Sequence, residues 1–133
     1  VGVEGGGMEE YSAIQVLEAF NFGFPLKRAL LLKDEEFAFR TIPIKSHTRR
    51  GLEVVKGRLI GKRGKTKRVL SEISGCAIII RDTEVGILGN VSQLEALETA
   101  IINLIKGTKQ SNVYHYLERM NRIKKEEDNL PIK

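Results

Sequence analysis

The amino-acid sequence predicts an α+β fold, and three observations support this prediction. From residue 37 onward, short apolar runs rich in β-branched residues alternate with segments whose apolar residues repeat at helical spacing. Glycines stand where these helical segments are expected to end. The 133 residues provide room for one domain with flanking elements, at the usual ~100 to 200 residues per domain, which excludes a large multidomain enzyme. The expected order from residue 37 is strand, helix, helix, strand, strand, helix.

Two helices are expected ahead of the first strand. The first spans residues 8–22, where apolar side chains repeat at helical spacing: Ile14, Leu17 and Phe20. Gly23 ends it, and Pro25 can open a second, short helix that runs through Leu32. Residues 37–44 are apolar and β-branched with a proline near their end, so we expect a strand at an edge of the sheet.

The middle of the chain predicts two short helices and a hairpin. The first helix runs into Gly61 and carries three apolar residues on one face: Leu52, Val55 and Leu59. The second follows Gly64, ends at Gly75 and carries a similar set: Val69, Leu70 and Ile73. Two apolar runs, 77–81 and 84–88, are separated by two polar residues, which predicts a β-hairpin.

Two longer helices complete the prediction. Ser92 and Glu95 form a candidate capping box ahead of a helix that ends at Gly107. Its buried stripe is expected to contain Leu94, Leu97, Ile101, Leu104 and Ile105. A final helix has five apolar residues at helical spacing: Val113, Tyr116, Leu117, Met120 and Ile123. From Lys124 onward we expect a charged tail.

The composition excludes several classes of protein. The longest unbroken apolar run, 76–80, is far shorter than the ~20 residues of a membrane-spanning helix, and the amino end does not resemble a signal peptide. We therefore expect a soluble, intracellular chain. Cys76 has no partner for an internal disulfide, and His47 and His115 have no metal-ligand neighbour at a suitable spacing. The chain begins with valine and a glycine-rich run, so we expect a truncated amino end.

The net charge of +5 comes from one segment. Residues 45–68 contain ten basic residues and one acidic residue, a charge of +9. The rest of the chain holds 12 basic and 16 acidic residues, a charge of −4. A concentrated basic segment indicates a polyanionic partner such as a nucleic acid, and a solvated surface run is the alternative.

The loop between the two short helices carries a candidate RNA-binding motif. Gly61 and Gly64 enclose Lys62 and Arg63, and glycine lets a ligand backbone approach closely because it has no Cβ. The following helix presents free N–H groups and the positive end of its dipole to the loop, which favours an anion. Gly-x-x-Gly spacing alone also fits an ordinary turn. The flanking helices and the +9 segment favour a phosphate-binding loop.

A P-loop is a rival interpretation of the same residues. Gly64, Lys65 and Thr66 match the end of a P-loop, but position 59, where that motif needs its first glycine, is leucine. The residues before the loop are also too charged for the buried strand that a P-loop requires. The sequence therefore disfavours an ATPase, and we expect no catalytic residue, no cofactor and no metal.

The way in which bases would be held is also constrained. No aromatic residue occurs between Phe39 and Tyr114, so bases cannot stack on an aromatic platform within this segment. We expect an aliphatic groove instead, formed by Val55, Leu59 and Ile60 on one side and by Ile78, Ile79 and Ile80 on the other. Strand side chains alternate between faces, so part of this set must lie in the core. Arg81 is a candidate for contact with a base or a phosphate, and a surface role is equally compatible.

The motif Ile60-Gly61-Lys62-Arg63-Gly64, in this order of elements, resembles a KH domain of the eukaryotic type (type I). A closer similarity is to the Dim-two-like assembly factors, also called Partner of Nob One. It rests on residues 57–67, on Ile87-Leu88-Gly89, and on residues 103–107 with 111–114. Residues 19–20 and 23–25 are similar to the family's junction between a first, divergent KH domain and the second. The similarity runs from residue 8 to residue 123.

This resemblance implies a βααββα fold, in which three helices cover a three-stranded sheet, with flanking helices. It implies a protein without enzymatic activity that binds the 3′ region of small-subunit rRNA during pre-rRNA maturation. The implied protein partners are a Nob-type PIN endonuclease and, in archaea, the alpha subunit of translation initiation factor two. The implied location is the cytoplasm in an archaeon, and the nucleolus and cytoplasm in a eukaryote.

We accordingly expect three parts: residues 1–36 from a preceding domain and connecting helices, the KH domain at 37–107, and a helix with a charged tail at 108–133. The expected RNA-binding residues are Arg58, Ile60, Gly61, Lys62, Arg63, Gly64, Lys65, Thr66, Lys67, Arg68, Ile79 and Arg81. The alternative function is a protein-docking scaffold with weak or nonspecific RNA binding, such as a Krr-like assembly factor or an initiation-factor partner. Its motivation is the number of phenylalanines around residues 20–24 and the tyrosines of the last helix.

Overall fold

The computed structural model describes residues 7–128, and its element order from residue 37 is the predicted one. The helices are α1 (Gly7–Phe22), α2 (Leu26–Ala29), α3 (Leu52–Ile60), α4 (Lys65–Ser74), α5 (Val91–Lys106) and α6 (Gln110–Asp128). The strands are β1 (Phe37–Pro43), β2 (Ala77–Ile80) and β3 (Glu84–Asn90). Short 3₁₀ turns follow α2 at Leu30–Lys33 and α3 at Lys62–Gly64. Residues 1–6 and 129–133, which include most of the glycine-rich start and the end of the expected tail, lie outside the described residues.

The three strands form one antiparallel sheet in the order β1-β3-β2. The register pairs Phe37 with Asn90 at one end of β1 and Pro43 with Glu84 at the other. β1 therefore lies at an edge, as its proline predicted, since proline has no N–H to donate to a second neighbour. The short β2 forms the other edge and pairs Ile79 with Gly86.

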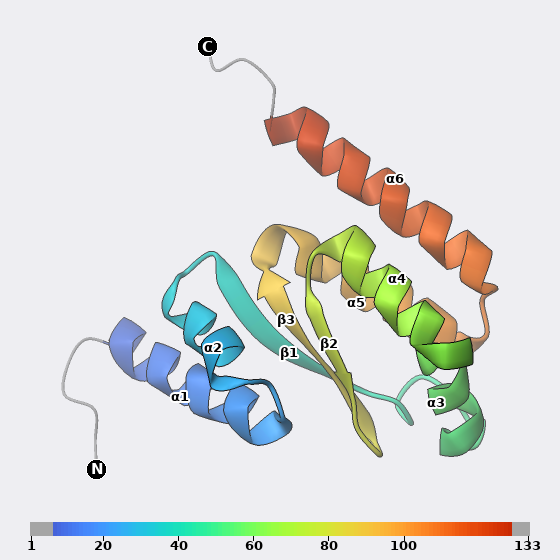
Figure 1. Ribbon diagram of the computed structural model, residues 1–133, viewed down its shortest axis with the longest axis horizontal. Helices are drawn as coiled ribbons and strands as arrows, with labels where there is room; N and C mark the ends of the chain where they lie inside the picture. Colours follow the sequence, from blue (N-terminus) through green and yellow to red (C-terminus); the bar gives the residue numbers. More distant parts are fainter. Residues whose placement is uncertain (1–6, 129–133) are drawn as a thin grey trace.

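Helices cover both faces of this sheet, as Figure 1 shows. α3, α4 and α5 pack on one face around the main core, and α6 lies against α4 and α5. All five apolar residues predicted for the stripe of α5 are buried there. α1 and α2 cover the other face around a smaller cluster that contains Ala19, Phe24 and Leu88. The three-stranded sheet with three covering helices and flanking helices is confirmed.

The first helix is present, but the apolar repeat that predicted it is not its buried side. Ile14, Leu17 and Phe20 are 52%, 61% and 51% exposed, whereas Ala19 is fully buried against the sheet. A small residue lets the helix approach the sheet closely, and larger residues beside it complete the contact. Phe22 and Phe24 supply that contact and meet Phe39 of β1, with ring centroids 5.6 and 5.8 Å from it.

The predictions for two helix ends were wrong. α5 begins one residue after β3 without a loop, and its amino end is capped by Asn90, whose side-chain oxygen accepts a hydrogen bond from the Ser92 N–H at 2.9 Å. The expected box of Ser92 and Glu95 is therefore inside the helix. α6 continues through the charged residues to Asp128, so the residues from Lys124 to Asp128 are helical.

No helix among the described residues is long and apolar enough to cross a membrane.

Candidate RNA interface

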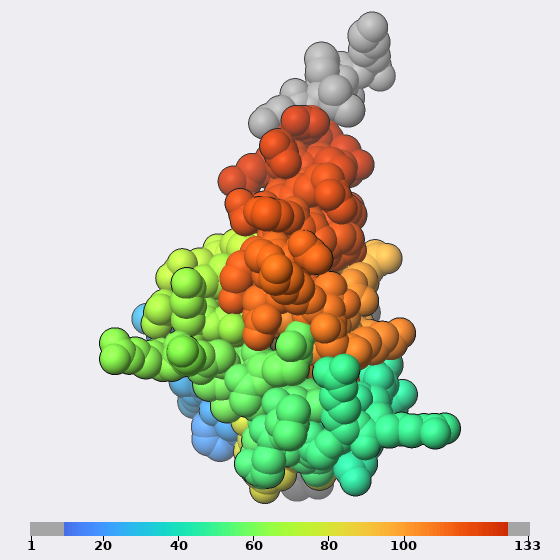
Figure 2. Space-filling model, turned by 90° about the vertical axis from the view of Figure 1, so that its right-hand side faces the viewer, coloured from blue at the N-terminus to red at the C-terminus, as the bar shows by residue number. Residues whose placement is uncertain are grey.

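The Gly-Lys-Arg-Gly loop joins α3 to α4 and projects from the body of the protein. Figure 2 shows the green segment that contains it extending from the surface, with α6 in orange and red above. Gly61 and Gly64 both have positive φ angles, 75° and 73°. Arg63, between them, is the one described residue other than glycine with a positive φ. A loop that follows a helix rather than a strand excludes the P-loop interpretation.

Gly61 is required by close packing. A Cβ at this position would lie 2.3 Å from the hydroxyl oxygen of Thr66 and 2.8 Å from the backbone nitrogen of Thr66. Thr66 itself is 4% exposed, and its hydroxyl accepts a hydrogen bond from the Tyr114 hydroxyl of α6 at 3.2 Å. Gly61 and Thr66 therefore form the internal support of the loop.

Gly64 differs from Gly61 in its surroundings. A Cβ there would have no heavy atom within 4 Å, so the space next to Gly64 is open. Its backbone adopts the left-handed conformation and starts α4, whose amino end has no side-chain cap. A phosphate can approach closely here, because the space beside Gly64 is open and the N–H groups at the start of α4 have no side-chain cap.

Five cations gather at the loop and the first turn of α4: Lys62, Arg63, Lys65, Lys67 and Arg68. All except the half-buried Lys67 are exposed. The ion pairs within the described residues, Arg40–Glu98, Lys56–Asp82 and Lys124–Glu127, use none of these five. Their charge is thus available to an external anion, which concentrates the positive potential at the loop.

A groove of about 370 Å³ extends from this cationic surface. It lies between α4 and β2 and is lined by Gly64, Lys67, Arg68, Ser71, Glu72 and Ile78. Ser71 and Glu72 were not predicted, although their spacing from Lys67 and Arg68 places them on the same face of α4. The Ser71 hydroxyl donates to the Cys76 carbonyl oxygen at 2.6 Å, and Glu72 is exposed at the groove.

The composition of the predicted aliphatic groove needs correction. Val55 and Leu59 are buried in the main core, while Ile60 is 38% exposed beside the loop. Ile79 packs with the α1–α2 cluster on the opposite face of the sheet, because side chains alternate along β2. Its placement opposes the prediction that it lines the groove. Ile78 provides the strand's contribution instead.

Part of the +9 segment serves the fold. The Arg58 Nε donates to the Leu104 carbonyl oxygen at 3.2 Å, and another nitrogen of the same guanidinium donates to the carbonyl of Thr108. The Arg50 guanidinium lies beside Gly107, at the same end of α5. Cations at the carboxyl end of a helix satisfy its free carbonyls and stabilise its dipole. Arg58 was predicted to contact RNA, and these internal bonds oppose that role.

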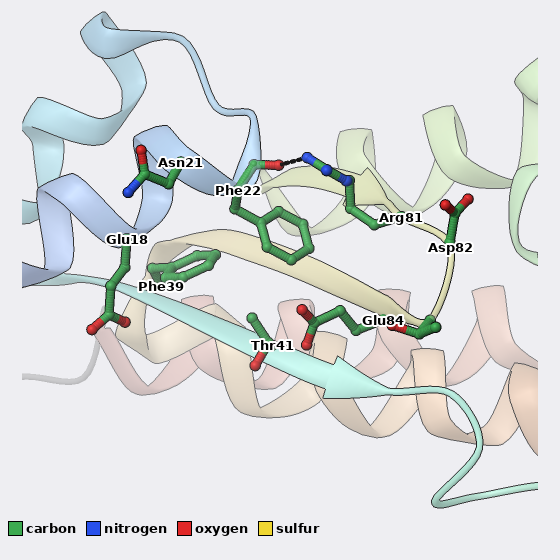
Figure 3. Close-up of a pocket in the computed structure, with 9 residues that line it drawn as sticks. Glu18, Asn21, Phe22, Phe39, Thr41, Arg81, Asp82 and Glu84 are labelled. Atoms are coloured by element: carbon green, nitrogen blue, oxygen red, sulfur yellow. Dashed lines mark hydrogen bonds between the residues drawn. The ribbon is translucent and has the colours of Figure 1, made fainter.

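Arg81 is likewise bound within the protein. Figure 3 shows its guanidinium donating to the backbone carbonyl of Phe22, and its central carbon lies 5.7 Å from the centroid of the Phe22 ring. These contacts join the end of α1 to the β2–β3 hairpin. The cavity beside them, of about 660 Å³, carries three carboxylates: Glu18, Asp82 and Glu84. Those charges disfavour a phosphate, so this larger cavity is less suited to RNA than the groove at the loop.

The described residues provide no metal-binding cluster of three or more His, Cys, Asp or Glu side chains. Cys76 is buried, and burial raises the pKa of its thiol, although a hydrogen bond with Ser74 opposes the shift. A protonated, buried thiol is a poor nucleophile. The arrangement at the loop offers binding chemistry for an anion, because five cations surround an open glycine.

The comparisons with known proteins agree with this geometry. A model of the second KH domain of PNO1 proteins, described as a eukaryotic-type KH domain (KH-domain type I), matches residues 38–122. The RNA-binding protein PNO1 of Oryzias latipes is 35% identical over 106 residues, which cover 77% of this chain and 44% of that protein. The chain thus spans less than half the length of this curated relative.

Solved structures show the same fold. Dim2p from Pyrococcus horikoshii superposes with a TM-score of 0.78 at 32% identity, covering 86% of this chain and 68% of that one. A chain of the a/eIF2alpha-aDim2p-rRNA complex from the same organism gives a TM-score of 0.80 at 31% identity, covering 90% and 66%. Since the family model matches most of the chain and the relatives share its fold, the chain belongs to the PNO1/Dim2 family of type I KH-domain proteins.

Proposed function

We propose that the protein binds single-stranded RNA at the Gly61–Gly64 loop, and that its target is the 3′ region of small-subunit rRNA during ribosome assembly. The observation that carries this proposal is the group of five cations without an ion-pair partner among the described residues, placed around an open glycine on a type I KH fold. A related Dim2p has been solved in a complex with rRNA and a/eIF2alpha. The protein acts by binding, without a catalytic step.

In the proposed mechanism the loop holds the RNA backbone and the groove holds the bases. A phosphate approaches Gly64 and the uncapped start of α4, where Lys62 and Arg63 supply charge. Bases enter the groove over Ile78, and Glu72 can accept hydrogen bonds from exocyclic amino groups. The loop of a KH domain clamps about four nucleotides.

The set of proposed contact residues differs from the sequence prediction, because five residues are removed from it and three are added. Direct contact is proposed for Ile60, Lys62, Arg63, Gly64, Lys65, Lys67 and Arg68, together with Ser71, Glu72 and Ile78 of the groove. Gly61 and Thr66 are assigned to support of the loop. Arg58, Ile79 and Arg81 make internal contacts and are removed from the proposed surface.

Charge reversal at the loop tests the proposal. In a variant with Lys62→Asp and Arg63→Asp, fluorescence anisotropy with a labelled oligonucleotide from the rRNA 3′ end should show a more than hundredfold loss of affinity. Two charged hydrogen bonds at about 1.5 kcal/mol each account for this magnitude. The matched control reverses Lys27 and Arg28, an adjacent exposed pair on α2, which lies on the other side of the sheet.

The control has the same change in net charge, so it separates a local contact from a general loss of attraction. If the protein neutralises three or four phosphates, the logarithm of its affinity should fall with the logarithm of salt concentration at a slope of about −2 to −3. The circular dichroism and melting temperature of both variants should match those of the original protein, because all four side chains are exposed. Equal affinity in the loop variant and the control would reject the proposed site.

The proposed partners beyond RNA are the alpha subunit of initiation factor two and a Nob-type PIN endonuclease. The first is supported by the composition of the solved complex of the relative, and the second by the resemblance of the sequence. We place the protein inside the cell with its rRNA, in the cytoplasm of an archaeon or in the nucleolus and cytoplasm of a eukaryote. The KH unit is assigned to residues 37–107, with flanking parts at 1–36 and 108–133.

Protein docking is a second candidate function, and a specific surface favours it. The outer face of α1 exposes four large apolar residues: Tyr11, Ile14, Leu17 and Phe20. An exposed stripe of this kind is typical of an interaction surface. If docking is a separate activity, a partner should remain bound to the Lys62→Asp, Arg63→Asp variant. Loss of every partner after ribonuclease treatment would contradict it.

A further inference from the structure

The last helix, α6, reaches the supporting side of the RNA-binding loop. α6 packs against both α4 and α5, and Tyr114 is in its first turns. The Tyr114 ring is half-buried against the main core, and its hydroxyl donates to the Thr66 hydroxyl oxygen at 3.2 Å. This bond joins residues 48 positions apart in the sequence. It connects α6 directly to the start of α4.

Thr66 transmits this contact to the loop. Its side chain is packed so closely on Gly61 that a single added methyl group at Gly61 would overlap the Thr66 hydroxyl. A buried hydroxyl needs a hydrogen-bond partner, and no buried side-chain N or O atom in the described part of the chain lacks one. The Tyr114 bond satisfies this hydroxyl and fixes the rotamer in which it lies against Gly61.

We propose that Tyr114 is a positioning residue for RNA binding, which acts through Thr66 to hold the loop in its binding conformation. The inference rests on the proposed RNA-binding function and concerns how the same site is kept ordered. A loop that is already ordered before it binds loses less conformational entropy when the RNA arrives. If so, the part of the chain that is needed for RNA binding includes the start of α6, which lies beyond residues 37–107.

The Tyr114→Phe variant tests this role because it keeps the ring and removes only the hydroxyl. Affinity for the rRNA 3′-end oligonucleotide should fall about fivefold, the equivalent of one net hydrogen bond. The salt dependence should stay the same, because no phosphate-binding cation has been removed. The matched control is Tyr116→Phe, since Tyr116 is a half-buried tyrosine of the same helix that packs on the same core. Its affinity should remain unchanged.

Thr66 provides the second arm of the test. Thr66→Val keeps the shape and removes the hydroxyl, so it should weaken binding to a similar extent, whereas Thr66→Ser should retain most of the affinity. Combining Tyr114→Phe with Thr66→Val should weaken binding little more than either change alone, because both remove the same bond. Fully additive losses, or unchanged affinity in both single variants, would overturn the proposal.

Amide hydrogen exchange without RNA separates this inference from the proposed function. Loss of the Tyr114 hydroxyl should accelerate exchange of the Gly61 and Gly64 amides, which donate to the carbonyls of Gly57 and Gly61. Exchange in the buried turns of α5 should not change. Unchanged exchange at the loop would overturn the positioning role even if RNA binds. If the Tyr114 variant exchanges faster at the loop but the original protein does not bind the oligonucleotide, the positioning contact is upheld and the proposed function is rejected.

Discussion

The two glycines of the loop should respond differently to the same substitution. Gly61→Ala should destabilise the fold, whereas Gly64→Ala should leave the fold nearly intact and weaken RNA binding. The difference follows from what surrounds each position. Gly61 lies against Thr66, and Gly64 faces open space. The pair therefore separates the structural role of the loop from its proposed contact with a phosphate.

The magnitude for Gly61→Ala has three sources. Its backbone, at φ 75° and ψ 174°, lies in a region used almost only by glycine, which costs another residue about 1–3 kcal/mol. The new Cβ would lie 2.8 Å from the Thr66 nitrogen, a backbone atom that cannot rotate away. Movement of the Thr66 hydroxyl would also weaken its bond with Tyr114, worth about 1 kcal/mol. We expect a loss of about 3 kcal/mol in the free energy of unfolding.

Gly64→Ala has a smaller structural effect. The left-handed conformation of Gly64, at φ 73° and ψ 15°, costs alanine about 1–2 kcal/mol. The reduced entropy of the unfolded chain offsets about 0.4–1 kcal/mol of this. No steric overlap is added, so the net loss should be about 1 kcal/mol. The methyl group would occupy the space through which a phosphate is proposed to approach.

Urea denaturation at equilibrium measures the stability of both variants, and fluorescence anisotropy measures their RNA affinity. The expected result is a large loss of stability for Gly61→Ala, and a loss of affinity out of proportion to stability for Gly64→Ala. Equal losses of stability would refute the account of the Thr66 contact. Unchanged RNA affinity in Gly64→Ala would refute the proposed approach of the phosphate.

Three further substitutions and the titration of one thiol test other parts of the structure. Arg58→Met should lower the free energy of unfolding by about 1–3 kcal/mol, because the carbonyls of Leu104 in α5 and of Thr108 just after it lose their donor. An unchanged midpoint of urea denaturation would contradict this role. Gly86→Ala would place a Cβ 2.4 Å from the Phe22 ring, so amide exchange should accelerate in α1 while the centre of α5 stays protected. Arg81→Ala should release the same end of α1 and leave RNA affinity within about twofold, a smaller change than the loss of one net hydrogen bond. Burial raises the pKa of the Cys76 thiol in the folded protein, so the protonated thiol favours the folded state. This contribution to the free energy of unfolding should be complete below the ordinary pKa of a thiol. It should disappear as the pH rises through the pKa of the thiol in the folded protein. Thiol reagents should accordingly label the folded protein more slowly than the urea-unfolded protein, and equal rates would contradict the burial.

Local sequence patterns predicted the order of elements well. The apolar repeat of α5 corresponds to a helix buried along one side, and the proline of β1 corresponds to an edge strand. The proline signal comes from the backbone of the residue itself, and the α5 signal comes from a periodic pattern over a long segment. The loop was also predictable, because two glycines and the cations between them are adjacent in the sequence.

Predictions of which side of a helix or strand packs against its neighbouring elements were less reliable. The repeat in α1 identified a helix, but the side that packs on the sheet is defined by Ala19 and by the aromatic residues after it. Alternation along β2 showed that one set of isoleucines faces away from the other. The structure shows which face Ile79 occupies. Ile79 pairs with Gly86, and the absence of a side chain at Gly86 makes room for the Phe22 ring on that face.

The charge pattern indicated the surface that is proposed to bind RNA, and the internal contacts of Arg58 remove one of its cations from that proposal. Arg58 bonds to carbonyls 46 and 50 residues further along the chain, and no local pattern reveals such a contact. The Tyr114–Thr66 bond was not predicted for the same reason. Long-range hydrogen bonds therefore decide which cations of the basic segment remain available to RNA.

An NMR titration tests the central claim most directly, because it locates RNA on the folded protein without any substitution. On addition of the rRNA 3′-end oligonucleotide, the amide signals of residues 61–68 and of Ser71, Glu72 and Ile78 should shift together. The signals of Glu18, Thr41 and Glu84, in the acidic cavity on the other face, should remain in place. Shifts centred on that cavity or on α1, with no change at the loop, would contradict the account.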